Sequence, residues 1–493
     1  MSFLTKKLRF TKFCTTITIS TFLSVTLFFS STLGVNATDF QAEADARKEL
    51  PVESNEIENW PNGPLIGADA AILIEASTGT ILYAKNITKK EYPASITKLL
   101  TSLIAIEHSN LDDDISFSHD AVFSVPSDAS GMGMDVGEQI TMEQALYGVL
   151  VGSANEAANA IGEYISGTLS DFSILMNEKA KQLGCLNSHF SNANGLFDDN
   201  HYTTAYDMSL IAKEFFSNEL LCKMSNTQIY NIPISDTQPD DIWIASHHKL
   251  LKGKQYEYEY IIGGKTGYTD KARQTLVSCA EKDGMRLICI ILKEESPDQF
   301  TDTLDLFNYG FSNFKMLNIA ENETQFNIQH SDFFESNTDV FGNSDPLLSL
   351  NKDSFIVLPI SAVFGDASSS LSYDTISDSS LAEITYTYQG VCVGTVTINL
   401  EKSSSDDIVF DGVLDNPKTA LDDPILSAEA NDKVIFINVK NIIFGILLIA
   451  FIVIILFIIR AIIRNYHFSR RRHLRLRRKK RRRHKSKYDG YDF

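Results

Sequence analysis

The chain has 493 residues, 44% of them hydrophobic, and a formal net charge of −19 at pH 7. This length suits about two or three domains, and the hydrophobic content excludes wholesale disorder. The charge is segregated, because fifteen Lys/Arg and two Asp/Glu lie from residue 460 onwards, a net of +13, which leaves −32 on residues 1–459. Residues 1–37 hold four bases and no acids, so residues 38–459 carry −36. Such an acidic segment disfavours nonspecific contact with nucleic acid.

Residues 1–37 have the pattern of a secretory signal peptide. Four basic residues precede an uncharged apolar run, residues 13–35, which ends in the small-residue pattern Val-Asn-Ala. We therefore expect cleavage after Ala37. The alternative is an uncleaved anchor, since the run is long enough to span a bilayer.

A second apolar run lies near the C-terminus. Residues 442–459 contain no charge, and at 1.5 Å per residue they give about 27 Å of helix, close to the thickness of a bilayer core. We expect a transmembrane helix at 441–463. The basic residues that follow mark the cytoplasmic side, so the tail, 464–493, is expected inside and the acidic body outside the cell membrane. Binding of nucleic acid or anionic lipid by the tail is the less favoured alternative.

The cysteines indicate neither a zinc site nor a dense disulfide framework. Five remain after loss of Cys14 with the signal peptide, and none has C-x-x-C spacing. Cys279 and Cys289 lie in apolar strand-like runs and are expected to be small core residues. An exported chain that does not depend on disulfides fits a bacterial envelope.

The exported body begins with residues 38–64, an acidic, proline-containing stretch that we interpret as a linker. Apolar, β-branched runs at 70–76 and 80–83 flank Ser-Thr-Gly and predict a hairpin. Helical spacing of apolar residues follows at 96–107, 141–151, 156–165 and 172–183. Strand-like runs return at 260–262, 275–280 and 285–292, before a helix at 300–311. Early and late strands with helices between them predict one α+β domain, residues 65–317, whose sheet is closed by distant segments.

The composition changes after residue 317. Residues 318–400 are rich in Ser, Asp and Asn and contain short strand candidates at 355–359, 382–388 and 391–400, which predict a small all-β domain. Residues 401–440 are acidic and are expected to form a stalk to the membrane.

A first motif, Ser95-Ile-Thr-Lys98, begins the predicted helix at 96–107. An i, i+3 spacing places Ser95 and Lys98 on one helix face, with Cβ atoms about 5–6 Å apart. A serine hydroxyl is a poor nucleophile and needs such a neighbouring base. Alone, the pattern is weak evidence, because S-x-x-K occurs by chance in many helices.

Two further motifs follow. Ser153-Ala-Asn155 lies between two predicted helices and could be an ordinary helix N-cap. Gly263-Gly-Lys-Thr-Gly267 lies on or beside a strand, where glycines let another backbone approach while Lys265 and Thr266 offer a cation and a donor to a carboxylate. Alternatively, residues 263–267 could form a glycine-rich turn. They do not have the sequence pattern of a phosphate-binding loop.

Together the three motifs are strong evidence. S-x-x-K, S-x-N and K-T-G in this order are typical of the penicillin-recognising serine acyltransferases. The chain resembles the penicillin-binding D-alanyl-D-alanine carboxypeptidases over about residues 65–315, including stretches 77–83, 192–207 and 283–287. The resemblance implies an α+β, β-lactamase/transpeptidase-like domain with an antiparallel sheet and a helical lobe. The small β domain and a C-terminal membrane anchor also match the plan of the family.

The resemblance also implies roles. Ser95 would attack the carbonyl of the penultimate D-alanine with Lys98 as general base, and Ser153 would pass a proton to the departing D-alanine. Asn155 and Lys265 would hold this network.

The resemblance places the substrate on the strand of the third motif. Thr266, Gly267 and Tyr268 would bind it, with the backbone N–H groups of Ser95 and Tyr268 as the oxyanion hole. No metal or organic cofactor is implied. The expected partners are peptidoglycan stem peptides ending in D-Ala-D-Ala, β-lactam antibiotics and the cell membrane, but not nucleic acid.

Four positions depart from the family. The middle residue of the second motif is Ala154, where Gly is usual, and Asn194 stands where His is often found. Gln299 stands where the family has an arginine that grips the substrate carboxylate. Arg273, at a position that is commonly Gly, is our candidate for a substitute.

Two alternative functions remain open. A serine β-lactamase would share all three motifs, but the class A enzymes activate water with a Glu between the second and third motifs. Here Glu163 and Glu178 fall on predicted helices. The other alternative is a catalytically weak penicillin-binding sensor or scaffold, which the departure at Gln299 favours and the intact motifs disfavour.

Overall fold

The structure is a computed structural model that describes residues 40–324, 348–373 and 380–400. The predicted signal peptide, stalk, transmembrane helix and basic tail lie outside the described residues. Within the described ranges, no helix combines the length and the apolar character needed to cross a membrane.

The centre of the fold is a five-stranded sheet with the order β2-β1-β9-β8-β7, in which every neighbouring pair is antiparallel. Its strands are β1 (Ala70–Glu75), β2 (Ile81–Lys85), β7 (Ile261–Thr269), β8 (Arg273–Lys282) and β9 (Met285–Glu294). The predicted hairpin is therefore confirmed as β1 and β2. The third motif lies inside β7, whose outer edge pairs with no other strand of this sheet.

Both faces of the sheet are covered, which explains the continuous apolar runs of its strands. Successive side chains of β1 point to opposite faces. Ile72 and Ile74 join a core with the helical lobe, whereas Ala71 and Leu73 join a second core with α10 (Asp298–Asn313). Cys279 and Cys289 are fully buried, one in each core, and all five cysteines in the described residues are unpaired.

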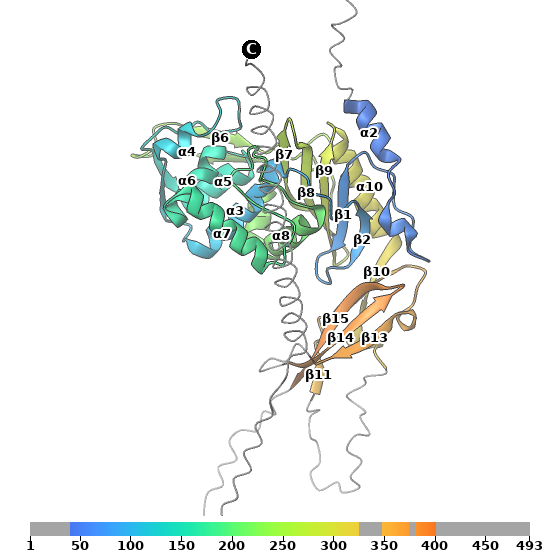
Figure 1. The fold of residues 1–493 in the computed structure, drawn as a ribbon. Coiled ribbons are helices and arrows are strands. Elements are labelled where there is room, and N and C mark those ends of the chain that lie inside the picture. The colour runs from blue at the N-terminus through green and yellow to red at the C-terminus, as the bar shows by residue number, and fades with distance from the viewer. Residues whose placement is uncertain (1–39, 325–347, 374–379, 401–493) are drawn as a thin grey trace, which may run out of the picture. The chain divides into compact units, whose positions relative to one another are not determined.

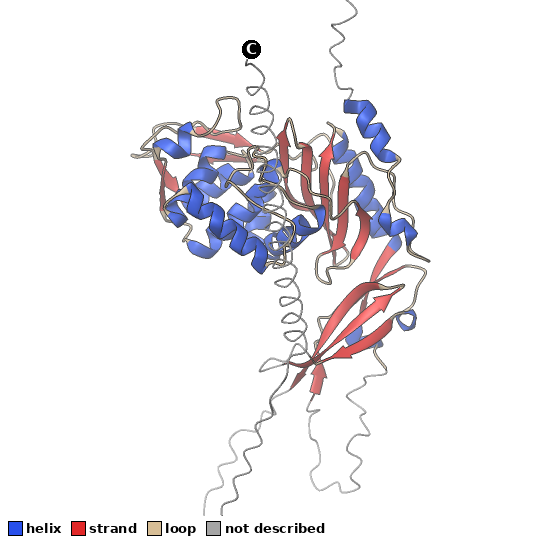
Figure 2. Ribbon diagram, in the orientation of Figure 1, coloured by secondary structure: helices blue, strands red, loops and turns tan. Residues whose placement is uncertain are grey.

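The helical lobe lies between the early and the late strands of the sequence and packs on one face of the sheet (Figures 1 and 2). Four of its helices were predicted within a few residues, namely α3 (Lys98–His108), α5 (Met142–Leu150), α6 (Asn155–Ser166) and α7 (Leu169–Gln182). The remaining helices of the lobe are α4 (His119–Phe123), α8 (Ala205–Ser217) and α9 (Glu219–Ser225). Two small two-stranded antiparallel sheets complete it, β3 (Asp114–Ser116) with β4 (Gln139–Thr141) and β5 (Ile229–Ile232) with β6 (Ile242–Ala245).

The interpretation of residues 38–64 as a linker is wrong. This stretch forms α2 (Phe40–Lys48) and the short 3₁₀ helix η1 (Glu53–Glu56), and it buries Arg47, Val52 and Trp60. The Arg47 Nε donates to the Gly67 carbonyl at 2.7 Å, and the Trp60 Nε1 donates to the Leu82 carbonyl at 2.9 Å. Hydrogen bonds and the buried Trp60 ring therefore hold this segment against the domain, although its acidic composition indicated a solvent-exposed linker.

Strands also occupy the region after residue 313. β10 (Phe314–Asn318) pairs with β12 (Phe355–Pro359). A four-stranded antiparallel sheet has the order β11-β15-β14-β13, with bounds Leu348–Leu350, Val391–Leu400, Ser380–Tyr388 and Ser368–Ser372. The strands β12, β14 and β15 match the predicted ranges. β10 crosses the predicted boundary at residue 317, so the region is joined to the first domain through a strand pair.

Candidate functional site

Ser95 and Lys98 lie at the start of α3, as the first motif predicts. Ser95 is in the 3₁₀ turn η2 (Ala94–Thr97), and Lys98 is the first residue of the helix. The Thr275 Oγ1 of β8 donates to the Pro93 carbonyl at 2.8 Å, which fixes this turn against the sheet. The Lys98 Nζ is 2.9 Å from the Ser95 Oγ, within the reach that proton transfer requires.

Lys98 is fully buried and has two further polar neighbours. Its Nζ lies 2.7 Å from the Asn155 Oδ1 and 2.6 Å from the Asn194 carbonyl. Desolvation, together with the nearby Lys265, lowers the pKa of Lys98 well below its usual value, and Glu156 opposes this shift. Because a neutral amine has two N–H donors and one lone pair, these contacts fit an amine that donates to both carbonyl oxygens and accepts from the Ser95 hydroxyl.

The second and third motifs meet at a second lysine–serine pair. The Lys265 Nζ donates to the Ser153 Oγ at 3.0 Å and to the Thr266 carbonyl at 2.7 Å. Burial lowers the pKa of Lys265 to about 7. Asn155, the first residue of α6, donates through its Nδ2 to the Ser130 carbonyl at 2.8 Å, so its Oδ1 is held towards Lys98.

The backbone around the nucleophile is tightly constrained. Ala94 and Ser153 both have φ in the left-handed region, at 51° and 57°, where residues with a Cβ are strained. A Cβ on Gly195 would lie 2.0 Å from the Ala94 carbonyl oxygen, and one on Gly267 would lie 2.8 Å from the Ser95 nitrogen. The two glycines therefore let the loop and β7 approach the nucleophile closely.

A cleft of about 460 Å³ opens over these groups. Its walls include six of the predicted residues: Ser95, Ser153, Asn155, Thr266, Gly267 and Tyr268. Lys98 and Lys265 are buried behind their serines. The structure thus brings together eight of the nine predicted site residues.

Arg273, the ninth, is not among the residues that line the cleft. Its guanidinium donates to the Glu295 carboxylate from Nε at 2.9 Å and from Nη2 at 2.6 Å. It also lies 3.8 Å from the centre of the Phe40 ring. Its Nη1 donates to the Tyr268 hydroxyl at 3.2 Å.

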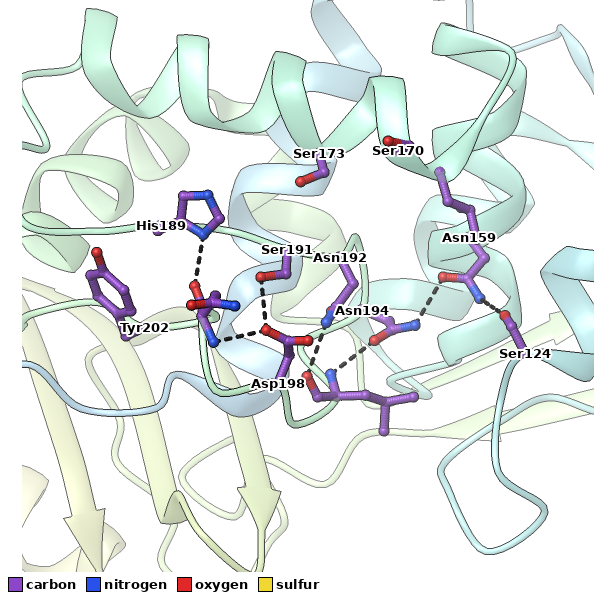
Figure 3. Close-up of a pocket in the computed structure, with 13 residues that line it drawn as sticks. Ser124, Asn159, Ser170, Ser173, His189, Ser191, Asn192, Asn194, Asp198 and Tyr202 are labelled. Atoms are coloured by element: carbon purple, nitrogen blue, oxygen red, sulfur yellow. Dashed lines mark hydrogen bonds between the residues drawn. The ribbon is translucent and has the colours of Figure 1, made fainter. Parts of the chain in front are cut away.

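Asn194 holds the site from behind, a role that the motifs did not reveal. Its carbonyl accepts from Lys98, and its Nδ2 donates to the Asn159 Oδ1 at 2.9 Å. Asn159 in turn donates to the Ser124 hydroxyl at 3.0 Å (Figure 3). A backbone carbonyl has no sequence signature, so this contact could not be predicted from residue types.

The hollow drawn in Figure 3 is larger than the cleft, at about 840 Å³, but it contains neither lysine nor nucleophile. Its polar atoms largely bond one another, as Ser191 with Asp198 and His189 with the Asn200 carbonyl do. We therefore assign the chemistry to the smaller cleft. In the described ranges no group of three or more His, Cys, Asp and Glu side chains could hold a metal ion.

Known proteins resemble the segment that carries this site. A family model described as D-alanyl-D-alanine carboxypeptidase matches residues 57–296. DacF, a D-alanyl-D-alanine carboxypeptidase of Bacillus subtilis, is 32% identical over 254 residues, which are 50% of this chain and 63% of DacF. A D-alanyl-D-alanine carboxypeptidase of Streptomyces sp. is 29% identical over 259 residues, which are 50% of this chain and 89% of that relative. The match thus spans somewhat less than two thirds of DacF.

A solved structure agrees on the fold. Penicillin binding protein 5 from Haemophilus influenzae aligns with 69% of this chain and 98% of its own, with a TM-score of 0.56 and 23% sequence identity. The predicted transpeptidase-like fold of mixed helix and sheet is therefore confirmed. Residues 57–296, whose motif residues gather in one cleft, are thus similar to the D-alanyl-D-alanine carboxypeptidases.

Proposed function

We propose that the protein is a serine-type D-Ala-D-Ala carboxypeptidase that removes the terminal D-alanine from peptidoglycan stem peptides and is acylated by penicillins. The observation that carries the proposal is the distance of 2.9 Å between the Ser95 Oγ and the Nζ of a fully buried lysine with a lowered pKa. A buried amine with a lowered pKa gives up its proton more readily than a solvated lysine and can therefore act as a general base.

In the acylation step, Lys98 takes the proton of the Ser95 hydroxyl. The Ser95 Oγ then bonds to the carbonyl carbon of the penultimate D-alanine. Asn155 and the Asn194 carbonyl hold the amine by two hydrogen bonds, so its lone pair remains directed at the hydroxyl. A positioned base of this kind contributes about 10²–10⁴-fold to the rate.

The second lysine–serine pair serves the leaving group. When the carbon–nitrogen bond breaks, the departing D-alanine needs a proton on its nitrogen. Ser153 lines the cleft and accepts a hydrogen bond from Lys265 at 3.0 Å, so it can donate its own proton and recover one from the lysine. The pKa of about 7 places Lys265 close to balance between donor and acceptor.

The oxyanion that forms on the carbonyl would be stabilised by the N–H groups of Ser95 and Tyr268. Gly267 supports this assignment, because a Cβ there would lie 2.8 Å from the Ser95 nitrogen, so β7 and the nucleophile are close. Donors fixed in a water-poor cleft are worth several kcal/mol in the transition state, about 3–4 for one donor.

Water then hydrolyses the acyl-enzyme. Of the residues that line the cleft none is a glutamate, whereas class A β-lactamases use a glutamate at this step. Glu163 lies in α6 and accepts from the Ser118 hydroxyl at 2.6 Å, and Glu178 lies in α7. This composition favours slow turnover of antibiotics and therefore a peptidase over a β-lactamase.

The experiment combines a fluorescent penicillin with a pentapeptide that ends in D-Ala-D-Ala. The full chain should form a stable fluorescent adduct and release D-alanine, and both should vanish in Ser95→Ala. An adduct without release of D-alanine would support a penicillin sensor. Rapid loss of the adduct with hydrolysis of the antibiotic would support a β-lactamase.

We further propose that the protein is anchored in a bacterial cell membrane with its catalytic residues outside and its basic tail inside. The support is the charge segregation and the two apolar runs of the sequence. Protease added to intact cells should remove residues 40–400 and spare an epitope on the tail. Loss of the tail epitope while the body stays intact would reverse this topology.

A further inference from the structure

The substrate proposed above ends in a free carboxylate, yet the position at which the family has its carboxylate-binding arginine holds Gln299. This residue is 3% exposed, and its side-chain amide lies 3.1 Å from the Gln274 side-chain amide and within 3.3 Å of the Glu295 and Pro297 carbonyls. A buried and neutral amide with an internal partner supplies little to an incoming anion. A cation for the substrate carboxylate must therefore come from elsewhere in the cleft.

Arg273, the candidate from the sequence, is already occupied. Its two hydrogen bonds to Glu295 neutralise the guanidinium, and the Phe40 ring of α2 covers it. Moving Arg273 into the cleft would break these hydrogen bonds to the Glu295 carboxylate, whose side chain is only 8% exposed, and would leave it the longer contact with the Arg47 Nη2 at 3.9 Å. That cost argues against a substrate-binding role.

Lys249 is a cation in the cleft that is available to bind a carboxylate, whereas Arg273 is not. It is the one Lys or Arg among the residues that line the cleft in the described part of the chain. Its ammonium forms no ion pair with any described residue, and its Nζ lies 5.7 Å from the centre of the Phe300 ring, next in sequence to Gln299. The cation is thus unpaired, half-buried and beside the position vacated by the arginine.

The backbone that presents Lys249 is firmly held. His248 is 2% exposed, and its Nε2 lies 2.9 Å from the Ser278 Oγ of β8. Leu250 and Leu251 are fully buried in the core with α10. A long side chain on a fixed backbone loses less orientational freedom when it binds than one on a loose loop.

The other titratable groups in the cleft do not compete for this role. Desolvation and the nearby Lys265 lower the pKa of His247 from 6.5, which favours its neutral form over a second cation. Asp128 and Asp270 are exposed acids that would repel a carboxylate. The Thr266 hydroxyl, which lines the same cleft, can donate a hydrogen bond to the anion.

We propose that Lys249, together with the Thr266 hydroxyl, binds the C-terminal carboxylate of the substrate in place of the arginine that Gln299 replaces. The inference rests on the proposed carboxypeptidase function. It assigns to this chain a specificity residue that distinguishes a free C-terminus from a blocked one.

The test compares acetylated L-Lys-D-Ala-D-Ala with its C-terminal amide on the full chain. In Lys249→Ala, kcat/KM for the acid should fall about 10- to 100-fold, as expected for the loss of a charged hydrogen bond. The value for the amide should fall much less, so that the acid-to-amide ratio drops at least about 10-fold. Lys249→Arg should restore most of this preference. Lys252→Ala, an exposed lysine outside the cleft, is the matched control and should leave both values unchanged.

Two results would overturn the assignment. One is an unchanged acid-to-amide ratio in Lys249→Ala, and the other is a collapse of that ratio in Arg273→Ala alone. Acylation by benzylpenicillin and by its methyl ester gives a readout that needs no peptide hydrolysis. Lys249→Ala should slow acylation by the acid more than by the ester. If the wild-type chain is labelled by penicillin but releases no D-alanine, the proposed carboxypeptidase function is refuted. The comparison of benzylpenicillin with its ester then still tests the role of Lys249.

Discussion

Each of the two serines of the site either follows a residue with left-handed backbone conformation or adopts that conformation itself. Ala94, with φ 51°, directly precedes Ser95, and Ser153 itself has φ 57°. Each such residue costs of order 1–3 kcal/mol and persists only where its surroundings enforce it. For Ala94 the enforcement comes from close packing of η2 against Gly195 and Gly267. We infer that this packing keeps Ser95 in the wall of the cleft.

Gly195→Ala tests this packing. The added Cβ would lie 2.0 Å from the Ala94 carbonyl oxygen and 3.0 Å from the Ser95 nitrogen. We expect the rate of acylation by fluorescent penicillin to fall at least about 10-fold, since displaced reacting atoms lose near-attack geometry. Gly167→Ala is the matched control, because its φ is also positive, at 78°, and no atom lies within 4 Å of its added Cβ. Equal acylation losses in the two variants would contradict the packing argument.

The lowered pKa of Lys98 predicts the pH dependence of acylation. Desolvation disfavours the ammonium, so the neutral base forms well below pH 10.5, the value for a solvated lysine. The acylation rate should therefore rise with pH through the lowered pKa and reach a plateau before the alkaline range. Stopped-flow labelling with penicillin would measure this profile. A rate that rises steadily to pH 10 would show that Lys98 has the pKa of an ordinary lysine.

The Lys98→Ala variant should lose about 10²–10⁴-fold in acylation rate, whereas Lys252→Ala should not change this rate.

The motif residues of the site could be predicted from sequence because their chemistry depends on side-chain type and local spacing. Ser95 and Lys98 are one helical turn apart, which fixes their distance. The Asn194 carbonyl and the Lys249 ammonium reach the site through the fold of two long loops. Their positions depend on tertiary packing, which no local pattern encodes.

At the scale of elements, apolar runs predicted the central strands and the four helices of the lobe well. The same reasoning failed for α2, because the acidic and proline-containing composition of residues 38–64 indicated a linker. What holds α2 is the contact of Arg47 with the Gly67 carbonyl and with the carboxyl groups of Glu294 and Glu295, at 3.8 and 3.9 Å. The two glutamates are more than 200 residues away in sequence, so a local sequence window does not reveal them.

The joint between α2, β9 and α10 predicts a pH-dependent stability. Glu294 of β9 is fully buried beside Asp302 of α10, and burial together with Asp302 raises its pKa above 4.5. The folded state then keeps a proton that the unfolded state releases. The stabilising effect is complete below about pH 4.5 and is lost as the pH rises towards the raised pKa.

Glu294→Gln carries a permanently neutral group and should escape this loss. The melting temperature of Glu294→Gln relative to that of wild type should therefore increase from pH 5 to pH 8. The corresponding difference in the free energy of unfolding should grow by at most about 1.4 kcal/mol per pH unit. Thermal unfolding followed by circular dichroism measures the difference. Glu58→Gln, an exposed position, should show a constant difference. A constant difference for Glu294→Gln as well would refute the buried, protonated carboxyl.

At the scale of the whole molecule, the second core continues from the central sheet into the region after residue 313. It contains Leu73 and Leu82 of the sheet together with Val357 of β12 and Ile384 of β14. Trp60 connects the two parts, with its ring centre 5.1 Å from that of Phe314 and 6.3 Å from that of Tyr388. The sequence predicted a separate small β domain, and a shared core implies instead that the two parts stabilise each other.

Tyr388→Ala tests this coupling in the full chain. The Tyr388 side chain is 6% exposed and packs on Trp60, so its loss should cost about 3 kcal/mol of unfolding free energy, as for other buried aromatic residues. If the core is shared, the temperature at which the protein loses its capacity to be labelled by fluorescent penicillin should fall together with the melting temperature. Tyr373→Ala, which is 64% exposed, controls for removal of a tyrosine and should change neither. A Tyr388→Ala chain that keeps the wild-type labelling temperature would show that the catalytic residues unfold independently of β14 and β15.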